Sequence, residues 1–279
     1  MIIGHNLAAS KVLYFLNINQ MHMQKAMFRL STGKRINSAA DDPAGLTISE
    51  HMQAQINSLD AASRNTQNSI CMLQTAEGGL NETQSILQRM NELATQAANG
   101  TNSPTAISGI KSELSQLEDE ISHICNSTNF NGINLLGSSS NLNMQIGATD
   151  NSYDKLSLNL SSFNTAKSLA SIINGGSINV DNVTDARNSI SVIQNAIDEI
   201  SSSRSLIGAY ENRLNYSIDN LNSEEENLTS AESKITDADM AKEILQYSKY
   251  SLLQQVARAM MSQALHQEPN SVLKLLDSL

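Results

Sequence analysis

Two stretches of this 279-residue chain space their aliphatic residues at alternating intervals of three and four. One stretch lies near residues 41–128 and the other near 183–235, and a segment rich in Gly, Ser and Asn separates them. Heptad spacing sustained over this length predicts helices that each bury a narrow apolar seam against another helix. The two stretches are far apart in the sequence. We therefore expect a mainly α-helical fold in which the chain folds back on itself as a long antiparallel coiled-coil rod.

Capping residues delimit the expected helices. Asp42 precedes Pro43, and Ser103 precedes Pro104, so each pair offers a side-chain acceptor followed by proline at the first helical position. A helix over 43–98 would be roughly 80 Å long, and the short connection that follows predicts an antiparallel partner.

Glycines and charged residues interrupt the seams. Gly78 and Gly79 weaken the long helix by about 1 kcal/mol each and are candidates for a bend. Arg204, Glu211 and Glu225 occupy heptad positions of the second stretch. We expect these three side chains at the edge of the seam or where it meets a neighbour.

The middle segment has the period of a β-strand. Aliphatic and polar residues alternate in two short runs, at Leu142, Met144 and Ile146 and again at Leu156, Leu158 and Leu160. Turn-forming residues join the runs, which predicts a small β-hairpin.

Composition narrows the function classes. Trp is absent and aromatic residues make up 4% of the chain, which argues against a thick globular core. The net charge of −10 argues against nucleic acid as a partner.

The first 40 residues are basic. This is compatible with a targeting peptide or a membrane-surface helix, but packing on other helices is favoured. The apolar run at 12–16 is too short for a cleavable signal or a membrane span, so no membrane partner is expected.

The residues that carry chemistry form no recognisable catalytic motif. The five histidines are scattered, and neither a phosphate-binding loop nor a nucleophile elbow is present. We expect no enzyme activity, no cofactor and no metal site. Cys71 and Cys125 are expected as two small buried thiols, and a disulfide between them stays open because it depends on the register of their helices.

Several motifs resemble bacterial flagellin. Leu-Ser-Thr-Gly-Lys-Arg-Ile-Asn at 30–37 and Asp-Asp-Pro-Ala-Gly-Leu at 41–46 are similar to its N-terminal signature. Gln-Thr-Ala-Glu-Gly-Gly-Leu-Asn-Glu at 74–82 is similar to its long-helix motif, and the runs at 226–231 and 235–241 to its C-terminal half. The resemblance covers roughly residues 1–147 and 184–276. Gly4, the two cysteines and the last three residues depart from the usual pattern.

The resemblance implies a function and partners. It implies a structural subunit that leaves the cell by type III export and polymerises with itself into the extracellular flagellar filament, which serves motility. The implied partners are an export chaperone, the filament cap and hook-associated proteins. The alternative is a hook–filament junction protein, which shares the motifs at 30–37 and 41–46. An unrelated coiled-coil adaptor is disfavoured by the order of the motifs.

The resemblance also implies two domains. Residues 1–40 and 236–279 would form an inner coiled-coil domain, and residues 41–235 a helical rod domain with the β-hairpin near 130–180. Asn, Gln and Ser interrupt the terminal seams, so we expect these segments to be disordered in the monomer and to gain order among copies. The expected polymerisation seam contains Ile3, Leu7, Leu245, Leu252 and Val256.

In the family, one face of the rod is bound by Toll-like receptor 5. The matching positions are Arg89, Leu93 and Glu113. An exposed Arg beside an apolar Leu suits an interface anchor. The competing interpretation is an ordinary solvated helix face.

Overall fold

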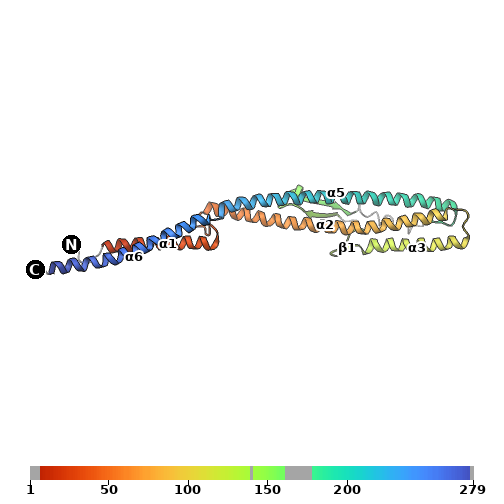
Figure 1. Ribbon diagram of the computed structural model, residues 1–279. Coiled ribbons are helices and arrows are strands. Elements are labelled where there is room, and N and C mark those ends of the chain that lie inside the picture. Colours follow the sequence, from red (N-terminus) through yellow and green to blue (C-terminus); the bar gives the residue numbers. More distant parts are fainter. Residues whose placement is uncertain (1–6, 139–140, 161–177, 277–279) are drawn as a thin grey trace. The chain divides into compact units, whose positions relative to one another are not determined.

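The computed structural model describes residues 7–138, 141–160 and 178–276. The chain divides into two compact units, which we call the terminal unit (residues 1–54 and 227–279) and the central unit (residues 55–226). Five long helices account for most of the described chain, which confirms the mainly α prediction: α1 (Leu7–Thr32), α2 (Pro43–Ala97), α3 (Pro104–Ser127), α5 (Val183–Thr236) and α6 (Met240–Leu276) (Figure 1).

In the central unit, α2 and α5 pack lengthwise in opposite directions. Arg204 of α5 reaches Glu77 and Gln84 of α2, whereas the later residue Leu221 lies near the earlier residue Leu59. The heptad series of α5 is buried at Ile193, Ile200, Ile207, Leu214 and Leu221, and α2 buries Leu59, Leu73, Leu80, Leu87 and Met90. The long antiparallel seam predicted from the sequence is therefore present.

The helix ends follow the predicted caps. The Gly45 amide donates to Asp42 Oδ1 at 3.0 Å before α2, and the Ala106 amide donates to Ser103 Oγ at 3.2 Å before α3. At the start of α6 the Lys242 amide donates to Asp239 Oδ1 at 3.1 Å. Each capping side chain satisfies an amide that the helix leaves without a partner.

Two small antiparallel hairpins follow α3. The first joins β1 (Asn129–Phe130) to β2 (Ile133–Asn134) through Asn131 and Gly132, whose φ angles of 50° and 80° suit a tight two-residue turn. The second joins β3 (Asn141–Gln145) to β4 (Lys155–Asn159), with the 3₁₀ turn η1 (Ser152–Asp154) between them. Met144, Ile146, Leu156, Leu158 and Leu160 are buried, which confirms the alternation predicted for this hairpin.

Gly79 lets the segment after α3 pack against α2. A methyl group at Gly79 would lie 2.8 Å from Leu136 Cδ1 and 2.9 Å from Thr128 Oγ1, whereas one at Gly78 would meet no atom within 4 Å. Both glycines lie inside the continuous helix α2. Gly79 is therefore explained by close packing.

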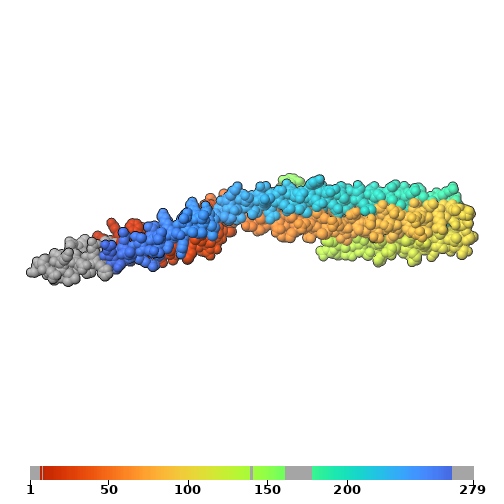
Figure 2. Space-filling view, viewed as in Figure 1, coloured from red at the N-terminus to blue at the C-terminus, as the bar shows by residue number. Residues whose placement is uncertain are grey.

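In the terminal unit, α1 and α6 lie along each other in opposite directions (Figures 1 and 2). Gly33 ends α1 with a φ of 71° and accepts a hydrogen bond from the Ala238 amide at 2.8 Å. The Arg35 amide donates to the Thr236 carbonyl at 2.6 Å, and Lys34 and Asp237 form an antiparallel bridge. The turn at 33–35 is therefore joined by backbone hydrogen bonds to the turn between α5 and α6.

The two thiols have different surroundings. Both cysteines are free; Cys125 is buried and Cys71 is exposed, so the prediction of two buried thiols is wrong for Cys71. Burial raises the pKa of the Cys125 thiol to about 11, which keeps it protonated and unreactive at neutral pH.

Candidate functional site

The two faces of α6 differ in how far they are covered. The face toward the rest of the terminal unit buries Glu243, Gln254 and Ala257. The opposite face carries aliphatic side chains that are exposed: Ile244, Leu245, Leu252, Leu253, Val256 and Met260. Because the larger apolar residues lie outward, this helix leaves in water the surface that it gains most by burying.

Helix α1 also exposes many large apolar side chains. Ala26 is buried, whereas large apolar side chains are exposed at Leu7, Leu13, Tyr14, Phe15, Met21, Met27 and Phe28. Val12, Leu16, Met23 and Leu30 are half-buried at heptad spacing with Ala26, so the contact with α6 covers one apolar face of α1 only in part and leaves the residues named above uncovered.

Four of the five residues predicted for the polymerisation seam lie within the described residues. Leu7 and Leu245 are 66% and 71% exposed, and Leu252 and Val256 are exposed as well. Ile3 lies outside the described residues. Leu7, Leu245, Leu252 and Val256 lie outside the contact between α1 and α6, which uses other faces of both helices. Within the terminal unit they are free to contact other molecules.

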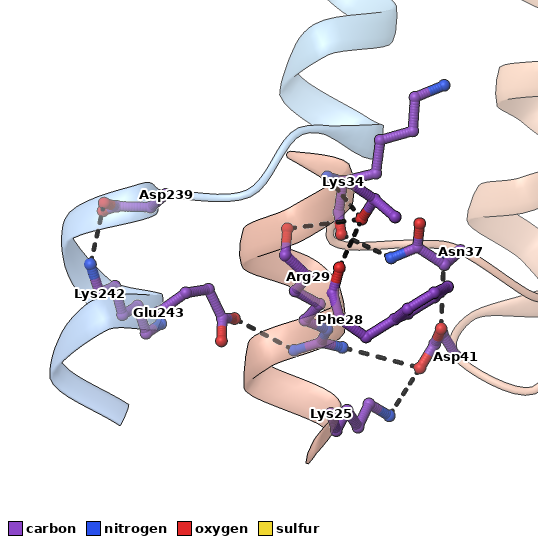
Figure 3. Close-up of polar contacts among 10 residues, drawn as sticks. Lys25, Phe28, Arg29, Lys34, Asn37, Asp41, Asp239, Lys242 and Glu243 are labelled. Carbon is purple, nitrogen blue, oxygen red and sulfur yellow. Dashed lines mark hydrogen bonds and ion pairs between the residues drawn. The ribbon is translucent and has the colours of Figure 1, made fainter. Parts of the chain in front are cut away.

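An ion-pair network fixes the end of α1 (Figure 3). Arg29 lies between two carboxylates, with Nη1 3.2 Å from Glu243 Oε1 of α6 and Nη2 3.8 Å from Asp41 Oδ1. Lys25 Nζ approaches Asp41 Oδ1 to 2.6 Å, and the Asn37 amide donates to Asp41 Oδ2 at 3.3 Å. The network therefore joins α1, the loop before α2, and the first turn of α6.

The network leaves two buried polar atoms without a hydrogen bond. Arg29 Nε and Glu243 Oε2 are buried and have no hydrogen-bond partner among the described residues. The hydrogen bond from Lys25, opposed by partial burial, lowers the pKa of Asp41, and the Asn37 amide and Arg29 act in the same direction as Lys25. Glu243 is buried, so its negative charge depends on Arg29 for compensation.

A ring contact adds to the pairing of the terminal helices. His22 of α1 stacks on Tyr250 of α6 with ring centroids 4.9 Å apart and an interplanar angle of 19°. Lys249 Nζ lies 5.7 Å from the Tyr250 centroid. This contact lies two turns along α1 from Arg29, so the two helices are held together at two separate levels.

The residues predicted to meet a receptor lie in the central unit. Arg89 of α2 donates to Glu113 Oε1 of α3 from Nε at 3.1 Å and from Nη2 at 2.9 Å, and to Glu92 Oε2 from Nη1 at 3.1 Å. Leu93 is only 2% exposed and belongs to the core, so its side chain is not available beside Arg89 on the surface. The structure brings Arg89 and Glu113 together on the surface but buries the Leu93 side chain.

Sequence reasoning missed the roles of Arg29 and Glu243. Each is one charged residue in an amphipathic helix. Arg29 and Glu243 are 214 residues apart in the sequence, so no local pattern indicates that they form a pair. Asp41 lies within the motif at 41–46, but only the neighbouring Asp42 was assigned a role, as the cap of α2.

No helix in the described ranges is long and apolar enough to cross a membrane. Among the same residues, His, Cys, Asp and Glu side chains form no cluster of three or more that suits a metal ion.

Comparison with known families gives matches at both ends of the chain. Residues 3–141 match the bacterial flagellin N-terminal helical region, and residues 190–276 match the bacterial flagellin C-terminal helical region. Together the two matches cover more than half of the sequence.

Individual relatives agree with these matches. The chain is 43% identical to a flagellin of Halalkalibacterium halodurans and 42% identical to a flagellin of Bacillus subtilis, in each case over 99% of this chain and 100% of the relative. The crystal structure of Bacillus cereus flagellin aligns with a TM-score of 0.50 at 34% identity, covering 57% of this chain and 88% of that one. A putative flagellar hook-associated protein from Vibrio parahaemolyticus aligns with a TM-score of 0.58 over 71% of this chain and all of that one, but at 15% identity this likeness shows the fold alone.

Proposed function

This chain belongs to the bacterial flagellin family, and from that premise we propose that it polymerises into a flagellar filament through the exposed apolar faces of α1 and α6. As a flagellin it is a structural subunit of the filament. The observation that supports the proposed surface is the set of large apolar side chains that α1 and α6 leave exposed outside their contact with each other.

The physical reason is the free energy of apolar burial. A fully buried Leu or Val side chain contributes roughly 1.5–3 kcal/mol relative to an exposed one. In a single chain this contribution is absent for Leu245, Leu252 and Val256. Contact with neighbouring copies would supply it and would offset the cost of ordering the terminal segments.

We also propose the other partners that the resemblance implies. An export chaperone that covers α6 before assembly would protect the apolar side chains that later contact other subunits. Contacts with the filament cap and with hook-associated proteins would use surfaces of the assembled subunit. Type III export and an extracellular filament fit a chain in which the described helices are too polar to cross a membrane.

The hook–filament junction alternative has less support. The relatives that match over nearly the full length are flagellins, whereas the hook-associated structure shares the fold at 15% identity. In purified flagella a filament subunit forms the major protein band and a junction protein a trace band.

Recognition by Toll-like receptor 5 stays a proposal that rests on Arg89 and Glu113. Their ion pair lies on an exposed face that spans α2 and α3. Arg89→Ala is expected to reduce receptor activation in cells that express the receptor, whereas Arg64→Ala, another exposed α2 arginine with an ion pair, should leave it unchanged. Equal activation by both variants would contradict the proposal. Since Leu93 is buried, a change there would act first on stability.

The proposed polymerisation surface is tested by Leu252→Asp. We expect the monomer to keep its helical circular dichroism while seeded polymerisation slows at least about tenfold, because a charge replaces an apolar contact between copies. The measurement is the sedimentable fraction with time, together with electron microscopy of the product.

Gln255→Asp is the matched control. It adds the same charge at an exposed position of α6 without removing an aliphatic group. Polymerisation near the wild-type rate for Gln255→Asp, with loss for Leu252→Asp, supports the assignment. Wild-type polymerisation by Leu252→Asp would refute it.

A further inference from the structure

The apolar seam between α2 and α5 repeats with little variation. On α5 every seventh residue is a buried aliphatic one: Ile193, Ile200, Ile207, Leu214 and Leu221. On α2 the buried residues repeat at the same interval: Leu59, Thr66, Leu73, Leu80 and Leu87. Sliding one helix along the other by one heptad would bring nearly the same side chains together again. The apolar residues therefore favour the pairing of the two helices but do not select one register.

One polar layer interrupts this repetition. Arg204 of α5 donates from Nη1 to Gln84 Oε1 at 2.6 Å and from Nη2 to Glu77 Oε1 at 3.2 Å. Glu77 and Gln84 are one heptad apart on α2, which runs along α5 at this level (Figure 1). The Arg204 side chain is 30% exposed, so it lies at the edge of the seam, as its heptad position predicted.

The neighbouring heptad positions of α5 have other chemistry. Ile197, one heptad before Arg204, is partly buried against the core. Glu211, one heptad after it, has a buried Oε1 atom without a hydrogen-bond partner among the described residues. Burial, with the charge of Glu77, raises the pKa of Glu211, as expected for two carboxylates near each other. The series along α5 is therefore apolar, cationic and anionic.

This series makes the possible registers unequal. Sliding α5 by one heptad in one direction would place Glu211 where Arg204 now lies, and its carboxylate would face that of Glu77. Sliding it in the other direction would place Ile197 there and leave Gln84 beside an aliphatic side chain. Only the observed register gives the Arg204 guanidinium both of its acceptors.

We propose that Glu77, Gln84 and Arg204 form a register lock, which selects one alignment of α2 with α5 among alignments that differ by one heptad. A polar residue at a single seam position can fix the register of a coiled coil at a cost in stability. Arg204 Nε and Glu211 Oε1, both buried without a hydrogen bond among the described residues, are such a cost.

The lock acts within one chain and goes beyond the proposed function. A slip of one heptad displaces the two helices by about 10 Å along their axes. A helical assembly is built from identical subunits, so a slipped chain would not fit among copies in the observed register.

Spin-label distances measure the register in the monomer. Gln67→Cys on α2 and Asn195→Cys on α5 provide labels at exposed positions, in a Cys71→Ser background in which Cys125 is buried. Because Arg204 lies level with Glu77 and Gln84, the two labels are offset along the helix axes. A slip of one heptad then changes their separation by nearly the full displacement of about 10 Å. With the lock intact, double electron–electron resonance should give one distance.

Removing the lock should permit a second register. The variant Glu77→Leu, Gln84→Leu and Arg204→Leu is expected to keep its helical circular dichroism and to unfold at no lower urea concentration, because the whole polar layer is replaced by apolar groups. It should show a second distance, displaced by about 10 Å. Asp60→Leu with Arg64→Leu removes an exposed ion pair within α2 and is the control, which should keep the single distance.

Moving the lock tests the proposal without a change in composition. Ile197→Arg with Arg204→Ile shifts the cation one heptad earlier on α5. The introduced guanidinium reaches Glu77 and Gln84 only if α5 slides by one heptad, so the main distance should shorten by about 10 Å. A main distance equal to that of the wild type in this exchange variant would overturn the proposal, and so would a single unchanged distance in a folded three-leucine variant. Both distances are measured on the monomer, so they do not depend on whether the chain polymerises.

Discussion

Gly78 and Gly79 are neighbours in the sequence with different surroundings. Gly78 is exposed and a side chain there would meet nothing, whereas Gly79 faces Leu136 and Thr128 closely enough to exclude a methyl group. The sequence marked both as weak points of a helix, but only the tertiary structure shows that one of them creates space for another segment.

Alanine at the two positions is expected to act in opposite directions. Gly78→Ala should raise the free energy of unfolding by about 0.5–1 kcal/mol, because Ala favours the helix. Gly79→Ala should lower it by about 1 kcal/mol, since overpacking against Leu136 exceeds the same helical gain. Urea titration of the full chain measures both, and a stabilised Gly79→Ala would contradict the packing argument.

Glu118 makes stability depend on pH. Burial, with the neighbouring Asp119, raises its folded-state pKa from the ordinary value of 4.5 to about 7, so the folded chain binds more protons than the unfolded chain between these values. The contribution of this group therefore favours folding at low pH and is lost as the pH rises through 7.

Glu118→Gln should remove this dependence of the free energy of unfolding on pH. At pH 8 the variant is expected to be more stable than the wild type by roughly 1 kcal/mol, after discounting for water that screens a half-buried group. At pH 4 the two should be equal. Glu120→Gln changes an exposed neighbour and serves as the control. If the free energy of unfolding of wild type and of Glu118→Gln changed with pH in the same way, the prediction would be refuted.

Helical periodicity predicted where the apolar face of each helix lies, but it did not predict whether another helix covers that face. The α5 heptad from Ile193 to Leu221 is buried as expected, because α2 offers an equally long apolar face. In α6 the expected apolar residues Leu245, Leu252 and Val256 are exposed, because α1 packs against the face that carries Glu243, Gln254 and Ala257. Leu93 was assigned to the surface face by motif, yet the packing of the central unit places it in the core.

The pairing of α1 with α6 depends on few polar contacts. Glu243 is buried and Arg29 neutralises it, and each leaves one buried polar atom without a partner. The capping residues were predictable from local sequence, since a cap and its amide are three residues apart. This ion pair was not, because its partners are 214 residues apart.

Arg29→Met should loosen the terminal unit. Removing the cation leaves Glu243 buried and uncompensated, at an expected cost of about 2–3 kcal/mol. Hydrogen exchange across α1 and α6 should then be faster than in wild type.

Two comparisons make the effect of Arg29 interpretable. Lys25→Met, which removes a more exposed cation, should cost less than about 1 kcal/mol. The double variant Arg29→Met with Glu243→Met should recover most of the loss, and no recovery would show that packing by the Arg29 side chain, and not its charge, carries the effect.

At the scale of the whole molecule, the sequence predicted that distant segments meet, and they do so in each unit. The antiparallel pairs of α2 with α5 and of α1 with α6 both join residues from opposite halves of the chain. That prediction was based on the heptad spacing of two distant stretches and on the order of the motifs. The register of α2 against α5 was not predictable, because the buried apolar residues of both helices repeat at the same interval.

Assembly is expected to change the order of the terminal segments. In the monomer the amides of α1 and α6 should exchange with solvent quickly, and in the filament at least about a hundredfold more slowly, because contacts between copies cover apolar side chains that the single chain leaves exposed. The amides of α2 and α5 within the central unit are the internal reference and should change little. Equal protection of α1 and α6 in both states would contradict the expectation.

The backbone hydrogen bonds between the turn at 33–35 and the turn at 236–238 have a consequence for biosynthesis. Arg35 and Ile235, which also share a hydrogen bond in this turn, are 200 residues apart. At about 5–20 residues per second a ribosome needs roughly 10–40 s to make the intervening chain. Throughout that interval α1 has no α6 to pack against, so the terminal unit can form only after nearly the whole chain has been made.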